Sequence, residues 1–129
     1  MRFIPSRVHA VMDYLVGLVL MAAPFVAGFA DAGAGAWVPI ALGAGVIAYS
    51  LFTDYELSVS RAIPLPAHLG LDVAGGALLA ISPWALGFDD RVWAPHLVIG
   101  LLEIGTALAT RTVPETGPAH AAGGRRRST

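Results

Sequence analysis

The chain has 129 residues and a net charge of −1 at neutral pH; 56% of its residues are hydrophobic and only 13% are charged. A soluble domain usually carries about 25% charged residues, so this composition is typical of a membrane protein and argues against a soluble one. The sequence has no cysteine, which excludes disulfide bonds, thiolate metal sites and a cysteine nucleophile.

Four long apolar stretches define the predicted elements in chain order. A bilayer core about 30 Å thick requires about 20 helical residues. The stretch 34–53 has no charged residue, and each of the other three contains one histidine and one acidic residue. Sustained alternation of the kind expected in barrel strands is absent, and so are the polar faces that a soluble bundle needs. We predict transmembrane helices over residues 8–29, 34–53, 67–88 and 92–110.

An internal repeat relates the two halves of the chain. Residues 2–31 resemble residues 61–90, and both copies follow the pattern R-x-I-P-x3-H-x3-D-x10-P-x3-G-F. This pattern divides the chain into a first two-helix repeat over residues 1–56 and a second over residues 57–111. The remaining segment, 112–129, lacks an apolar face, and we expect it to be a disordered basic tail.

The positive residues predict the orientation in the membrane. Seven of the eight arginines fall outside the two short hairpin loops, at Arg2, Arg7, Arg61, Arg111, Arg125, Arg126 and Arg127. The positive-inside rule then places both termini and the central loop in the cytoplasm. The expected fold is an all-α bundle of four transmembrane helices, made of two two-helix repeats that are inserted in the same direction.

Composition also suggests where the protein resides and what it contacts. All basic side chains are arginine, and alanine and glycine are abundant, which suggests a bacterial inner-membrane protein. The lipid bilayer is the expected partner. The run Arg125, Arg126 and Arg127 favours a contact with anionic lipid over nucleic acid. Small residues within the predicted helices also leave room for self-association into a homo-oligomer.

Ionisable residues inside the predicted helices mark a candidate site. His9 and Asp13 are four residues apart and therefore share one helix face, and His68 and Asp72 repeat the pair. With a rise of about 1.5 Å per residue, Glu103 falls at nearly the depth of the two aspartates. Each ionisable group costs about 2.5–3.5 kcal/mol inside a membrane, so we expect these groups to face one another. The candidate binding residues are His9, Asp13, His68, Asp72, Glu103, Tyr14 and Tyr49.

Several interpretations of this site remain open at the level of sequence. The polar groups can serve only as hydrogen bonds between helices. They can also bind a divalent metal ion, with His9, Asp13, His68, Asp72 and Glu103 as candidate ligands. A haem held axially by His9 and His68 and a proton relay are further alternatives. His96, in the fourth helix, is expected near the opposite interface and outside the cluster.

An enzyme is the least favoured class. The sequence has no nucleophile–base pair, no phosphate-binding loop and no dinucleotide fingerprint, and no catalytic residue is assigned. A metal-activated water would be the only plausible chemistry. We therefore expect a non-enzymatic membrane protein whose internal polar site is structural or binds a ligand.

A motif in the second half resembles a known family. Ser82-Pro83-Trp84, with His68-x3-Asp72 before it and Gly87-Phe88 after it, resembles the SPW-repeat family of small bacterial membrane proteins. The first copy keeps only Pro24 and an aromatic residue of the triplet, so the serine has no counterpart there. The resemblance implies two transmembrane helices per repeat and implies no particular activity.

Overall fold

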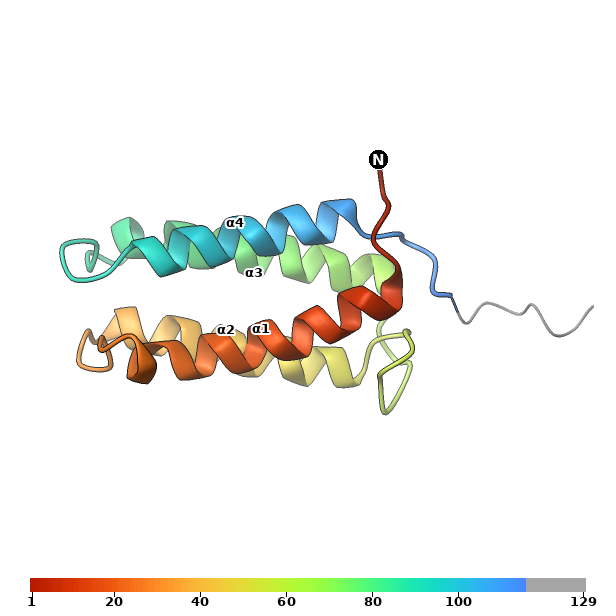
Figure 1. Ribbon diagram of the computed structural model, residues 1–129, viewed down its shortest axis with the longest axis horizontal. Coiled ribbons are helices and arrows are strands. Elements are labelled where there is room, and N and C mark those ends of the chain that lie inside the picture. The colour runs from red at the N-terminus through yellow and green to blue at the C-terminus, as the bar shows by residue number, and fades with distance from the viewer. Residues whose placement is uncertain (116–129) are drawn as a thin grey trace, which may run out of the picture.

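The computed structural model describes residues 1–115, which form four helices. These are α1 (Ser6–Val26), α2 (Ala34–Leu51), α3 (Leu65–Ala85) and α4 (Ala94–Ala109). Helices α1 and α2 form one antiparallel hairpin and α3 and α4 the other, with the N-terminus and the end of α4 at the same end of the bundle (Figure 1). The predicted all-α four-helix bundle is confirmed.

The outer surface of the bundle is apolar. Helices α1, α2 and α3 are long and apolar enough to cross a membrane, and α4 is a shorter apolar helix of 16 residues. Large apolar side chains face outward along the helices, such as Leu18, Ile81 and Leu101, each more than half exposed. A continuous apolar exterior is unfavourable in water and favourable in lipid, and it is typical of a membrane protein.

All four predicted helices end earlier than expected, α1 and α3 by three residues, α2 by two and α4 by one. The predicted ends at residues 29 and 88 become Val26 and Ala85. Gly28 and Gly87 have positive φ angles of 76° and 69°, a conformation that ends a helix and favours glycine. Helices α1 and α3 also begin two residues earlier than predicted, directly after a proline.

The repeated prolines disrupt the same point in α1 and α3. Pro83 has no N–H, so the carbonyl oxygen of Leu79 loses its usual helical donor. The hydroxyl of Ser82 donates to that oxygen at 2.8 Å. In α1, Pro24 removes the donor for Leu20 in the same way, but the residue before it is alanine. The serine of the motif therefore stabilises a carbonyl that proline has freed, in one repeat only.

Paired glycines hold each hairpin together. A Cβ atom added to Gly43 would lie 2.6 Å from the carbonyl oxygen of Gly17, which is too close for any side chain. In the second hairpin, a Cβ atom on Gly100 would collide with the carbonyl oxygen of Gly76. The equivalent glycines of α2 and α4 are thus 57 positions apart, and those of α1 and α3 are 59 apart.

Short backbone contacts join the two hairpins at the end that carries the termini. The N–H of Ile4 donates to the carbonyl of Ala109, and the N–H of Ile63 donates to the carbonyl of Phe52. These contacts are equivalent under the same offsets of 59 and 57 residues. The end of α4 is thereby fixed beside the start of α1, and the end of α2 beside the start of α3.

The segment 116–129 lies outside the described residues. The expected lipid contact of Arg125, Arg126 and Arg127 lies within this segment, and so does the predicted disordered tail over residues 112–129 apart from its first four residues.

Candidate metal centre

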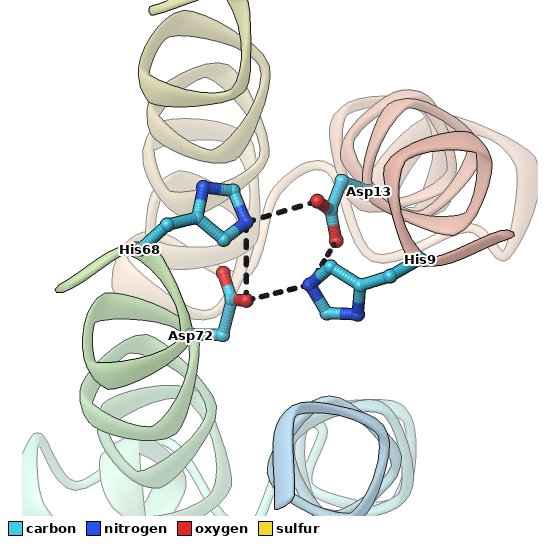
Figure 2. A group of neighbouring side chains, drawn as sticks. All are labelled: His9, Asp13, His68 and Asp72. Atoms are coloured by element: carbon cyan, nitrogen blue, oxygen red, sulfur yellow. Dashed lines mark hydrogen bonds and ion pairs between the residues drawn. The ribbon is translucent and has the colours of Figure 1, made fainter. Parts of the chain in front are cut away.

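Four buried ionisable side chains meet between α1 and α3. His9 and Asp13 come from α1, and His68 and Asp72 come from α3. They form a closed quadrilateral in which each residue points toward the centre (Figure 2). Their relative exposures are 1%, 7%, 0% and 5%. One ligand atom from each residue lies within 4.8 Å of all the others.

Each imidazole contacts both carboxylates through Nε2. His9 Nε2 lies 3.0 Å from an oxygen of Asp72 and 3.3 Å from an oxygen of Asp13. His68 Nε2 lies 3.0 Å from Asp13 and 3.2 Å from Asp72. The shorter contact of each histidine is therefore with the aspartate of the other repeat. The centre consequently requires both hairpins.

A threonine fixes the protonation of His68 at the opposite ring nitrogen. Thr53 Oγ1 lies 2.7 Å from His68 Nδ1 and also 2.7 Å from the carbonyl oxygen of Tyr49. A carbonyl can only accept, so the threonine hydroxyl must donate to it. The hydroxyl has one hydrogen, and His68 Nδ1 must therefore carry the proton that lies between it and Thr53.

His9 has the same arrangement in the other half. Thr110 Oγ1 donates to the carbonyl of Thr106 at 2.7 Å and lies 3.0 Å from His9 Nδ1. The Nδ1 atom of His9 is therefore also the donor. Each threonine and the histidine it contacts come from opposite repeats. The backbone contacts at the ends of α2 and α4 bring the two side chains together.

These hydrogen bonds determine what must occupy the centre. A neutral imidazole protonated on Nδ1 presents a lone pair at Nε2. Carboxylate oxygens are also acceptors, and acceptors facing each other at about 3 Å repel. A proton or a metal ion must therefore lie between them, and a proton can reside on Nε2 or on a carboxylate oxygen. Two protons and one divalent ion both neutralise the two aspartates.

Two tyrosine hydroxyls support the carboxylates. Tyr49 donates to Asp72 at 2.6 Å, and Tyr55 donates to Asp13 at 3.2 Å. Tyr55 lies in the linker after α2, and burial raises the pKa of its hydroxyl, which stays protonated as a donor. Both tyrosines come from the first half of the chain, so this part of the site is not symmetric.

Other candidate residues lie away from the quadrilateral. Glu103 is not part of the four-residue group, and it lines a groove between α2 and α3 together with Tyr49. Tyr14 donates to the backbone carbonyl of Leu57 and so faces the linker. His96, as expected, lies near the hairpin loops, where its Nε2 donates to the carbonyl of Gly35 at 2.9 Å. The proline at position 39 leaves that carbonyl without a helical donor.

The centre does not accommodate the haem arrangement considered above. A haem ligated by His9 and His68 would place a flat macrocycle between the two imidazole rings. The ring centroids are 5.5 Å apart, with an interplanar angle of 77°. The carboxylates of Asp13 and Asp72 lie in contact with both rings at that point, so the space is already filled.

Three of the contacting residues were missed by the sequence analysis. Thr53 and Thr110 occupy equivalent positions 57 residues apart, at the ends of the second and fourth helices. Extending the repeat alignment past the outer loops, with its two-residue change of offset, would have found the pair. Nothing in the sequence pattern singles out Tyr55, because the second repeat has Thr112 at the corresponding position.

Comparison with known proteins agrees with the architecture. The family model described as SPW repeat domain matches residues 7–110, which include all of the four helices except Ser6 at the start of α1. Searches of the curated proteins and of the solved structures found no match. The matched range contains the quadrilateral, the Ser82-Pro83-Trp84 triplet and both threonines, and this chain belongs to the family of SPW repeat domain proteins.

Proposed function

We propose that this protein is a multi-pass protein of the bacterial inner membrane, with both termini in the cytoplasm, and that His9, Asp13, His68 and Asp72 bind one divalent transition-metal ion. The observation that carries the proposal is the direction of the two imidazoles. Both Nδ1 atoms donate to threonine hydroxyls, so both Nε2 atoms face the carboxylates. Ligating histidines are commonly oriented through the other ring nitrogen in this way.

A divalent ion satisfies the charge balance of the cluster, as two protons also do. Two aspartates carry two negative charges, and two neutral imidazoles carry none. One divalent ion makes the group neutral, which is the favourable state for a buried cluster within a membrane. Imidazole and carboxylate together suit Zn²⁺, Mn²⁺ or Fe²⁺, and the absence of cysteine argues against metals that prefer thiolate.

The ligand spacing supports tetrahedral coordination. Bonds of about 2.0–2.2 Å to nitrogen and oxygen in a tetrahedron place neighbouring ligand atoms about 3.4 Å apart. The four Nε2-to-oxygen contacts measure 3.0–3.3 Å. These contacts use both carboxylate oxygens of Asp13, and one ligand atom from each of the four residues lies within 4.8 Å of the others, so some ligand atoms would have to draw closer together around the metal ion.

The competing interpretation is a structural ion-pair cluster. In it, each Nε2 carries a proton and both imidazoles are positively charged. The contact distances of 3.0–3.3 Å also suit such hydrogen bonds. The two interpretations differ in one measurable respect, because only the first retains a stoichiometric metal ion.

The test is metal content and affinity. The full chain is purified in detergent without a histidine tag, analysed for metal, stripped with chelator and titrated with Zn²⁺ by calorimetry. We expect one site per chain, lost in the double variant Asp13→Asn and Asp72→Asn. The matched control is Glu103→Gln, which changes an acidic residue of the membrane interior outside the quadrilateral and should bind normally.

Two results would reject the metal site. One is the absence of stoichiometric binding by the folded wild-type chain for Zn²⁺, Mn²⁺ and Fe²⁺. The other is equal loss of binding in the Glu103→Gln variant. In either case the ion-pair cluster would be the supported interpretation, and the double asparagine variant should then show only a lower thermal stability.

A further inference from the structure

A groove of about 300 Å³ opens between α3 and α4 at the end of the bundle that carries the termini. Its floor is apolar, and an arginine and a threonine stand at its rim. The groove lies where the helices end. Since the ends of transmembrane helices reach the membrane interface, its rim lies at the level of the lipid headgroups. The residues that define the groove are Arg2, Leu69, Gly70, Val73, Leu108 and Thr112.

The corresponding place in the first hairpin is filled. The counterpart of Val73 is Tyr14, whose hydroxyl donates to the carbonyl of Leu57 in the linker. The counterpart of Thr112 is Tyr55, which is only 1% exposed and packs in the core. In the second hairpin both positions hold smaller residues. Within residues 1–115, the larger side chains of Tyr14 and Tyr55 therefore occupy space in the first hairpin that the groove opens in the second.

Arg2 supplies a fixed positive charge at the mouth of the groove. Its Nη1 donates to the carbonyl of Thr110 at 2.7 Å and contacts that of Ala107 at 3.4 Å, at the C-terminal end of α4. A guanidinium has five N–H donors in a planar fork, and both of these contacts use the same nitrogen. The donors on the other two nitrogens are suited to a phosphate oxygen.

We propose that this groove binds an anionic phospholipid, with the phosphate on Arg2 and one acyl chain along Leu69, Val73 and Leu108. Charge complementarity identifies the occupant, since the groove joins an apolar floor to a guanidinium at headgroup level. Any acyl chain contacts the apolar floor equally well. The charge at the rim therefore sets the preference for an anionic headgroup over a zwitterionic one.

The experiment measures lipid selectivity of the full chain. The protein is placed in nanodiscs containing phosphatidylglycerol and phosphatidylcholine, and the lipids that stay bound are counted by native mass spectrometry. Wild type should retain one phosphatidylglycerol per chain. Arg2→Gln should lower this preference about fivefold, the effect expected for one arginine at an anionic surface.

Each of the two groove variants has a matched control variant. Arg61→Gln changes the equivalent arginine of the second repeat, which pairs with Asp54 at 3.6 Å and should have no effect. Gly70→Val fills the groove with the residue found at the equivalent position 11 and should displace the lipid without touching Arg2. Gly105→Val is its control, since both glycines face open space.

Defined outcomes would overturn the proposal. Equal losses for Arg2→Gln and Arg61→Gln would indicate general surface charge. Unchanged selectivity in Gly70→Val would show that the groove is not the site. Release of the lipid by millimolar inorganic phosphate, with no dependence on acyl chains, would assign the site to free phosphate. Thermal unfolding of every variant verifies that the fold is retained.

Discussion

The Nδ1 atom of His68 donates a hydrogen bond to the Oγ1 atom of Thr53, and these two residues belong to different repeats. Thr53 reaches this position because the backbone at the end of α2 pairs with Ile63, just before α3. His9 and Thr110 repeat the relationship with the repeats exchanged. The orientation of each imidazole thus depends on the association of the two hairpins. A hairpin by itself would have neither the second aspartate nor the threonine.

The threonine contacts give the first prediction. Thr53→Val keeps the shape of the side chain but removes the acceptor for His68 Nδ1, so the imidazole is free to change tautomer. Loss of such a supporting contact typically costs about 10–100-fold in metal affinity. Zn²⁺ titration of Thr53→Val should show a loss in this range, and Thr110→Val should match it. Thr53→Ser retains a hydroxyl and should bind nearly as wild type; an equal loss in this variant would show that the hydrogen bond is not the cause.

The second prediction concerns pH. A metal ion at the centre replaces protons on the two Nε2 atoms, so metal affinity must fall as pH falls and protons compete for the same lone pairs. Stability conferred by bound metal is therefore present at neutral pH and lost on acidification. Calorimetry of Zn²⁺ binding in buffers of different ionisation enthalpy would count the released protons. Affinity that does not change between neutral and mildly acidic conditions would mean that the imidazoles are not ligands.

The third prediction concerns helix packing. Gly43→Ala places a methyl group 2.6 Å from the carbonyl oxygen of Gly17, so α1 and α2 must separate. Overpacking of this kind costs about 1–3 kcal/mol, and thermal unfolding in detergent should show a lower midpoint. Gly45→Ala is the matched control on the same helix, because it faces open space, and it should be neutral or slightly stabilising. Equal destabilisation by both variants would contradict the close-packing argument.

Much of the fold could be predicted from local sequence. The uncharged stretches define the helices because bilayer thickness imposes their length. The histidine–aspartate pairs meet because ionisable groups in a membrane must face inward. Helices α1 and α3 end earlier than predicted because Gly28 and Gly87, each the glycine of the repeated pattern G-F, adopt positive φ angles that stop a helix.

The site was harder to predict because the depth of a residue in the membrane does not determine in which direction around the helix axis its side chain points. Glu103 has the right level in the membrane, but its direction around α4 takes it toward the α2–α3 groove. Tyr14 shares its helix with the quadrilateral and faces the linker for the same reason. Thr53 and Thr110 lie beyond the helices, and only the pairing of the chain ends brings them to the histidines.

The serine of the SPW triplet gives the last prediction. Ser82 donates to the carbonyl of Leu79, which Pro83 leaves without a helical donor. Ser82→Ala removes a buried hydrogen bond and should lower the free energy of unfolding by about 0.5–1.5 kcal/mol. The first repeat offers the reverse change, because Ala23 precedes Pro24 beside a small cavity that Leu20 also lines. Ala23→Ser should donate to the freed carbonyl of Leu20 and raise stability by a similar amount.

The double variant that carries both changes is the decisive measurement. It moves one hydroxyl from α3 to α1, so its unfolding midpoint should return close to that of wild type. Metal binding should be unaffected in all three variants, since Ser82 lies toward the hairpin loops and the quadrilateral lies toward the termini. If Ala23→Ser destabilises the protein as much as Ser82→Ala does, the hydroxyl of the triplet has a role other than satisfying a carbonyl that proline has freed.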